Sequence, residues 1–197
     1  MKRLPTHVFV LASGLLAACG QVSNMPEPSF ADIDAANAAA GELGSRLKGE
    51  LMAALQEGGP TGAIEVCAER APAIALTISE QTGYDISRTS AQTRNPANTA
   101  DAWEQGVLKM FEEALQSGVN PKFMEHSEVV LNADGSTDFR WMKPIFIEEP
   151  CTVCHGGNVS TDVKAQLAEW YPDDLATGYA VGDLRGAFTV RKPVEVN

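Results

Sequence analysis

The chain is poor in basic residues: 15 lysines and arginines stand against 26 aspartates and glutamates, and the formal net charge is −11. Such a surface disfavours contact with nucleic acid or with anionic lipid headgroups, whereas a basic redox or signalling partner protein remains compatible with it. Histidine is also scarce, with three residues, and cysteine has four. Each of these few side chains can therefore be considered individually as a ligand.

A long hydrophobic run is also missing. The apolar run from Val8 to Ala18 is too short for a permanent transmembrane helix, which needs about 20 apolar residues. It follows the basic start Met1-Lys2-Arg3 and ends in Leu16-Ala17-Ala18-Cys19, the order of a bacterial export signal. Because a cysteine after Leu-Ala-Ala resembles a lipobox, we expect residues 1–18 to be a lipoprotein signal peptide and Cys19 to carry the lipid.

The expected mature protein consists of a tether and one domain. Residues 19–30 are expected to tether a single domain at 31–197, because no internal repeat or second linker is present. Removal of the leader would leave 13 basic against 26 acidic residues and a net charge of −13. By resemblance to lipoproteins of Gram-negative bacteria, Gly20 favours a periplasmic, outer-membrane-anchored protein that contacts the membrane only through its lipid.

Two of the four cysteines belong to Cys151-Thr152-Val153-Cys154-His155, the C-x-x-C-H run that attaches a c-type haem. At this spacing two thiols can add to the two vinyl groups of one porphyrin, and the histidine can bind the iron as proximal ligand. A zinc half-site or a redox dithiol also contains C-x-x-C, but the export signal favours haem. We therefore expect one covalent haem, held by Cys151, Cys154 and His155.

Cys67 has no disulfide partner in its own chain if Cys19 carries lipid and the C-x-x-C pair carries haem. In an oxidising compartment such a thiol is buried and inert, bridges two chains, or binds the iron. For the sixth iron position the residues leave four alternatives: Cys67, a methionine, His126 and an open site. Met110 fits the buried stripe of a predicted helix. The methionines of the mature chain are Met25, Met52, Met110, Met124 and Met142.

Helical periodicity predicts four helices. The first is expected to end at Gly58-Gly59-Pro60, and the second to kink at Pro72, just after Cys67, because proline removes an amide donor. Asn98 or Thr99 can cap the third helix. The expected helices cover residues 33–55, 61–81, 101–116 and 161–170.

Alternating apolar residues predict a small sheet. Asp134-Gly135 is a strong hairpin signal between the second and third expected strands. Helices first and strands later favour an α+β fold, an antiparallel sheet with N-terminal helices packed on one side. The expected strands cover residues 84–90, 122–131, 137–147 and 184–190.

Nine short segments, spread over nearly the whole mature chain, carry a family resemblance. They are Ala63-Ile64-Glu65-Val66-Cys67, Ala71-Pro72, Arg88-Thr89-Ser90, Arg94-Asn95-Pro96-Ala97-Asn98, Trp103-Glu104, Lys143-Pro144-Ile145, Cys151-Thr152-Val153-Cys154-His155-Gly156, Tyr171-Pro172-Asp173-Asp174 and Gly182-Asp183-Leu184-Arg185-Gly186-Ala187. Together they resemble a bacterial exported c-type haem domain of unknown function with a PAS-like fold, found free or as a sensing module. The resemblance implies a haem held by C-x-x-C-H and a cysteine thiolate as the opposite axial ligand, at the position of Cys67.

Arginines are candidates for contacts with the haem propionates. Arg88 and Arg94 come first because they lie in resemblance segments, and Arg70 and Arg185 follow. For each, a surface or bracing salt bridge is the alternative. The segment Tyr171-Pro172-Asp173-Asp174 and the pair Gly182-Asp183 are expected to organise turns.

Three classes of function compete. The first is redox or gas sensing, in which a thiolate ligand keeps the potential low and leaves on reduction, opening a site for a diatomic gas. The second is a low-potential periplasmic electron carrier without ligand exchange. The third, a haem enzyme, is not expected, since no distal pair of histidine and arginine stands out.

Overall fold

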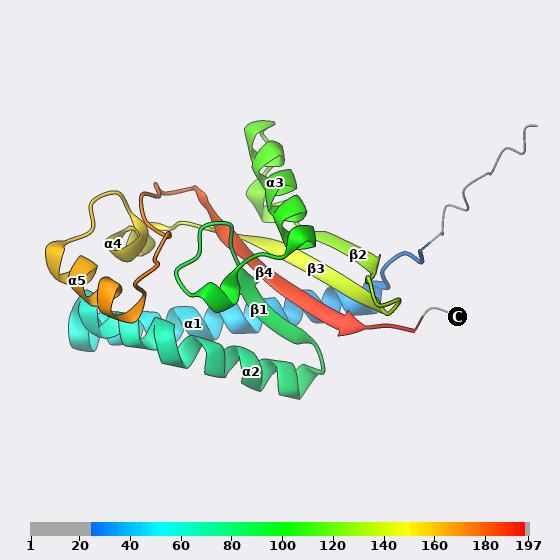
Figure 1. The fold of residues 1–197 in the computed structure, drawn as a ribbon, viewed down its shortest axis with the longest axis horizontal. Helices are drawn as coiled ribbons and strands as arrows, with labels where there is room; N and C mark the ends of the chain where they lie inside the picture. The colour runs from blue at the N-terminus through cyan, green and yellow to red at the C-terminus, as the bar shows by residue number, and fades with distance from the viewer. Residues whose placement is uncertain (1–24, 196–197) are drawn as a thin grey trace, which may run out of the picture.

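The computed structural model describes residues 25–195, where helices precede most of a four-stranded antiparallel sheet (Figure 1). The predicted α+β class, with N-terminal helices and an antiparallel sheet, is confirmed. The expected signal peptide, Cys19 and the tether up to residue 24 lie outside the described residues. Within residues 25–195, no helix combines the length and the apolar character that a membrane span requires.

The first helix, α1 (Phe30–Glu65), contains the predicted break. Its N-terminus is capped by Ser29, whose side chain accepts a hydrogen bond from the amide of Asp32. At Gly59 the backbone leaves the helical region, with φ 65° and ψ −168°, directly before Pro60. Because positive φ is accessible to glycine at low cost, the helix bends here and then continues. The expected stop is therefore a kink within α1.

A π-helical turn, Val66–Arg70, joins α1 to α2 (Ala71–Thr82). The amide of Ala71 donates to the carbonyl of Val66, five residues back, and so bypasses the carbonyl of Cys67. The next residue, Pro72, has no N–H. The carbonyl of Cys67 would accept from residue 71 in an α-helix and from residue 72 in a π-helix. Because Ala71 donates elsewhere and Pro72 has no amide proton, neither donor is available to it. The kink predicted near Pro72 takes the form of this irregular turn, which carries Cys67.

The sheet has the strand order β1-β4-β3-β2. The second and third strands form the predicted hairpin, with Gly135 at φ 84° in its turn. The second strand begins later than predicted, because Pro121–Phe123 forms a 3-10 turn. The strands are β1 (Asp85–Thr89), β2 (His126–Leu131), β3 (Thr137–Phe146) and β4 (Leu184–Pro193).

Helices cover both faces of the sheet (Figure 1). On one face, α1 and α2 pack Leu43 and Ile78 against Trp141. On the other face, α3 (Ala102–Gln116) packs Phe111 against Met142. The expectation of helices on one side only is wrong, because neighbouring residues of β3 are apolar and buried on opposite faces.

Asp101 caps the N-terminus of α3, whereas the sequence predicts Asn98 or Thr99 as the cap. The side chain of Asp101 accepts from the amide of Glu104, and the Glu104 carboxylate accepts from the amide of Asp101. This reciprocal capping box satisfies two amides at once, which a single cap does not. Met110, predicted to be buried, is 44% exposed, because it lies away from the side of α3 that packs on the sheet.

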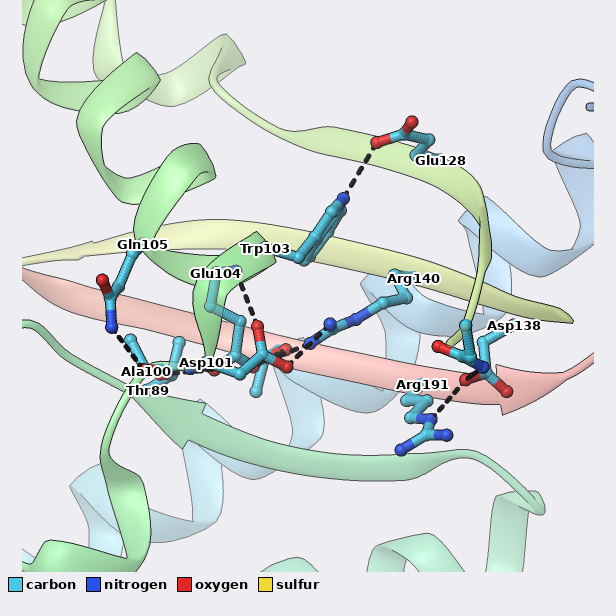
Figure 2. A network of polar contacts seen from close by, with 12 residues as sticks. Thr89, Ala100, Asp101, Trp103, Glu104, Gln105, Glu128, Asp138, Arg140 and Arg191 are labelled. Atoms are coloured by element: carbon cyan, nitrogen blue, oxygen red, sulfur yellow. Dashed lines mark hydrogen bonds and ion pairs between the residues drawn. The ribbon is translucent and has the colours of Figure 1, made fainter. Parts of the chain in front are cut away.

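Figure 2 shows a polar network that ties α3 to the sheet. Glu104 is buried and accepts hydrogen bonds from Thr89 of β1 at 2.9 Å and Thr189 of β4 at 2.7 Å. Arg140 of β3 lies 3.3 Å from Glu104 and stacks over the ring of Trp103 at 4.3 Å. Because the buried charges are paired, the network orients α3 at a low desolvation cost. Thr89 and Glu104, which belong to two of the segments that carry the family resemblance, thus stabilise the packing of α3 on the sheet.

The C-x-x-C-H segment and the helix after it lie at one end of the molecule (Figure 1). A 3-10 turn, Glu149–Cys151, leads into the single helical turn α4 (Thr152–His155). The predicted helix at 161–170 is confirmed as α5 (Thr161–Trp170). It packs against the C-terminal part of α1, where Val163 and Leu167 contact Ile64.

Candidate haem site

A cavity of about 580 Å³ lies between α1, the C-x-x-C-H segment and the end of the sheet beside it. This volume is within the range of small-molecule and cofactor sites. The walls are mainly apolar, and glycine lines them at Gly44 and Gly186. The apolar side chains along the wall include Leu47, Leu51, Ile64, Ile145, Phe146 and Phe188.

The C-x-x-C-H segment presents its three predicted site residues to this cavity. Cys151, Cys154 and His155 all line it, whereas Val153 does not and is 40% exposed. Positions i, i+3 and i+4 share one face of a helical turn, so the local helix brings the three residues together. Two thiols and one imidazole are thereby available to a single ligand inside the cavity.

The imidazole of His155 is held by a backbone carbonyl. Its Nδ1 lies 2.7 Å from the carbonyl oxygen of Ala176. A carbonyl only accepts, so Nδ1 carries the proton and Nε2 is left with a free lone pair. Burial, followed by the positive charges of Arg94 and Arg185, lowers the pKa of His155 from 6.5 to about 3. The ring is therefore neutral near pH 7, which is the form that binds iron.

Residues 174–179, here called the strap, cross the C-x-x-C-H segment. The amide of Tyr179 donates to the carbonyl of His155 at 3.0 Å, and the amide of Gly178 donates to the carbonyl of Gly156 at 3.1 Å. A Cβ at position 156 would lie 2.5 Å from the carbonyl oxygen of Thr152, so only glycine fits where α4 ends. The strap thus fixes the backbone at the histidine and directly after it.

Arg94 is buried between the strap and the C-x-x-C-H segment, at 8% exposure. It forms an ion pair with Asp174 at 3.0 Å and donates to the carbonyls of Cys154, at 2.6 Å, and Ala176, at 3.3 Å. The sequence predicted a turn at Tyr171-Pro172-Asp173-Asp174 and missed this pairing. Arg94 and Asp174 both lie in segments that carry the family resemblance, and this was the one sequence signal that could have indicated their ion pair.

Cys67, from the π-helical turn, also lines the cavity and is half-buried. Burial raises the pKa of its thiol, and the charges of Arg88, Arg94 and Arg185 act in the opposite direction. The structure therefore brings together the C-x-x-C-H residues and the cysteine to which the resemblance assigns the second axial position.

The other predicted candidates for the sixth iron position are mostly elsewhere. Met52 lines the cavity, with 36% exposure. Met124 and Met142 belong to the core beneath α3, and His126 lies beside Trp103, with 5.7 Å between the ring centres. Among the candidates for the sixth iron position within residues 25–195, only Cys67 and Met52 therefore line the cavity.

The cavity concentrates positive charge in an acidic protein. Arg88 lines it, and its side chain makes no hydrogen bond or ion pair within the described part of the chain. Arg185 also lines the cavity and donates to the side chain of Ser90 and to the carbonyl of Gln92. Within the described residues it forms no ion pair with a carboxylate. Arg70 is outside, where it pairs with Glu50 at 2.8 Å. Two arginines without carboxylate partners suit a ligand that carries two carboxylates.

Fold and cavity together define an α+β domain that encloses a large, mostly apolar cofactor site. The donor set fits a haem: two thiols at the C-x-x-C spacing, a free imidazole Nε2, a further thiol and two arginines. The chain belongs to the Tll0287-like family, whose model matches residues 15–193. This membership confirms the resemblance that the nine segments indicated.

One solved structure is similar to this chain over most of the length of both proteins. The crystal structure of the cyanobacterial heme-protein Tll0287 has 21% sequence identity to this chain and a TM-score of 0.63. The match covers 84% of this chain and 97% of that chain. At this identity the likeness supports the shared fold. The comparison with curated proteins gave no match.

Proposed function

We propose that this protein is an exported cytochrome with one covalent haem. Cys151 and Cys154 would form the thioethers, and His155 and Cys67 would be the axial ligands. The observation that carries the proposal is the convergence of these four residues on one apolar cavity. Membership of the Tll0287-like family and the fold shared with a haem protein support it.

The bound haem would supply one-electron chemistry at its iron. His155 would bind through Nε2, with its ring orientation held by the Nδ1–H bond to Ala176. Cys67 would bind as a thiolate, and an anionic sulfur ligand lowers the reduction potential. Arg88 and Arg185 would bind the propionates through bidentate contacts. Export and lipidation at Cys19 belong to the same proposal and are supported by the N-terminal sequence.

We propose redox or gas sensing as the role, with Cys67 as the residue that moves. Cys67 would be bound in the oxidised protein and would leave on reduction, making room for a diatomic gas. Its carbonyl has no donor from the following helical turn, so its backbone can shift at a lower cost than in a regular helix. The resemblance to PAS-like sensing modules supports the same role, and a partner protein would respond to the change.

The test is low-temperature EPR and absorption of the ferric protein, comparing wild type with Cys67→Ala and Met52→Leu. The low-spin thiolate signal should vanish in C67A and persist in M52L, because only the former loses the sulfur donor. Carbon monoxide should bind the wild type only after reduction. The reduction potential of C67A should rise, since axial ligands tune haem potentials over about 0.8 V.

An unchanged ferric spectrum in C67A would contradict the thiolate assignment. A reduced wild-type protein that binds no carbon monoxide would contradict the switch. Cys67 would then be a permanent ligand, and low-potential electron transfer would be the better function.

A further inference from the structure

The side chain of Arg94 contacts the same carbonyl that holds the imidazole of His155. The carbonyl oxygen of Ala176 accepts from Nδ1 of His155 at 2.7 Å and from Nη2 of Arg94 at 3.3 Å. A carbonyl oxygen has two lone pairs, so both donors can be accommodated. We propose that Arg94 and Asp174 are positioning residues for His155, in place of the propionate contact predicted for Arg94.

The contacts form a closed ring. Asp174 accepts from Nε of Arg94 at 3.1 Å through one carboxylate oxygen and from the amide of Ala176 at 2.8 Å through the other. Arg94 in turn donates to the Ala176 carbonyl and to the Cys154 carbonyl. Both the amide and the carbonyl of Ala176 are therefore held, the amide by Asp174 and the carbonyl by Arg94. Arg94 also contacts Cys154, and the backbone from Cys154 to His155 closes the ring at the imidazole.

The strap also contacts the backbone directly before Arg94. The amide of Leu175 donates to the carbonyl of Thr93, the residue before Arg94, at 2.9 Å. Leu175 is 63% exposed, whereas Ala176 is fully buried, so packing holds the strap at Ala176 but not at Leu175. The guanidinium of Arg94, which is nearly excluded from solvent, adds a direct side-chain restraint on the carbonyl that orients the histidine.

A group behind a metal-bound histidine affects the ring's orientation and basicity. Without Arg94, the strap would shift and the Nδ1–H of His155 would lose its acceptor for part of the time. The ring N–H would then exchange with solvent faster, and the less basic imidazole would stabilise Fe(III) less. Lysine would keep the charge, but its single nitrogen cannot replace both Nε, which donates to Asp174, and Nη2, which donates to the two carbonyls.

The inference rests on the proposed function, because His155 has to be the iron ligand. The test uses the holoprotein labelled with ¹⁵N-histidine, comparing wild type with Arg94→Lys and Asp174→Asn. The Nδ1–H of His155 should exchange about tenfold faster in R94K, a factor taken from the lower end of the losses in metal affinity or activity when groups behind metal-bound histidines are changed. The reduction potential of R94K should shift upward. D174N, which keeps Arg94 but removes its anionic partner, should change the exchange rate in the same direction.

Arg70→Lys is the matched control, since Arg70 lies outside the cavity, pairs with Glu50 and makes no bond to the strap within the described residues. Its His155 exchange rate should equal that of the wild type. Wild-type exchange in both R94K and D174N, or equal potential shifts in R94K and R70K, would overturn the positioning role. A wild-type protein without a haem-bound His155 signal would overturn the proposed function itself.

Discussion

At the scale of single residues, Gly186 shows how one missing Cβ shapes the cavity wall. Its φ is 156°, and a Cβ there would lie 2.3 Å from the carbonyl oxygen of Thr89. Both atoms belong to paired strands, so neither can move without disturbing the sheet. Glycine at this position lets β4 pass close to β1 beside the cavity.

We expect Gly186→Ala to lower the free energy of unfolding by about 1–3 kcal/mol, because the clash is with backbone rather than with a flexible side chain. Denaturant unfolding measures the change. Gly106→Ala is the control: it lies in α3 with nothing within 4 Å of the added Cβ. It should stabilise the protein by about 0.5–1 kcal/mol, since alanine favours helix. Equal effects in the two variants would contradict the steric explanation.

At the scale of elements, the π-helical turn decides where Cys67 points. Pro72 removes the donor that a regular helix needs, and the amide of Ala71 bonds five residues back. The turn therefore adds one residue before α2 continues. In a regular α-helix one residue corresponds to about 100° of rotation, so the same side chain would face another direction.

Pro72→Ala should favour a continuous α-helix from Ile64 to Thr82 and turn Cys67 away from the cavity. We expect the thiolate EPR signal to weaken or vanish, while the free energy of unfolding rises by about 1 kcal/mol as the helical bond returns. Pro60→Ala, at the other kink, is the control and should leave the EPR signal unchanged. A full thiolate signal in P72A would show that the π-helical turn does not position the sulfur.

At the scale of the whole molecule, acidic residues exceed basic ones by 11, while arginines gather around the cavity. Haem propionates would neutralise two of those arginines, so the negative surface would dominate encounters with other molecules. The molecule should therefore attract cationic redox reagents and repel anionic ones.

The rate of oxidation of the reduced protein by a cationic ruthenium complex should fall by about tenfold between about 0.01 M and 1 M salt, because screening shortens the range of attraction. The rate with an anionic cyanoferrate oxidant should rise over the same range. Stopped-flow absorption measures both. Equal salt dependence for the two oxidants would contradict steering by the acidic surface.

Much of the fold followed from local sequence. The break at Gly59-Pro60, the hairpin turn at Gly135 and the helix α5 each depend on residues close in the chain. The cap of α3 and the exposure of Met110 were predicted wrongly. The cap depends on which nearby side chain reaches the free amides of the helix, and the exposure of Met110 depends on which side of α3 packs on the sheet. Local sequence patterns contain neither piece of information.

The sequence by itself determined that two thiols and an imidazole stand at the spacing typical of c-type haem attachment, because that spacing lies within five consecutive residues. It also indicated Cys67 as a ligand through the resemblance. Only the tertiary structure decided that Cys67 and Met52, of the predicted candidates, line the cavity, and that Arg94 bonds to the strap. The bond between Arg94 and Ala176, for example, joins residues 82 positions apart, and the packing of helices and strands, rather than any local preference, sets such contacts.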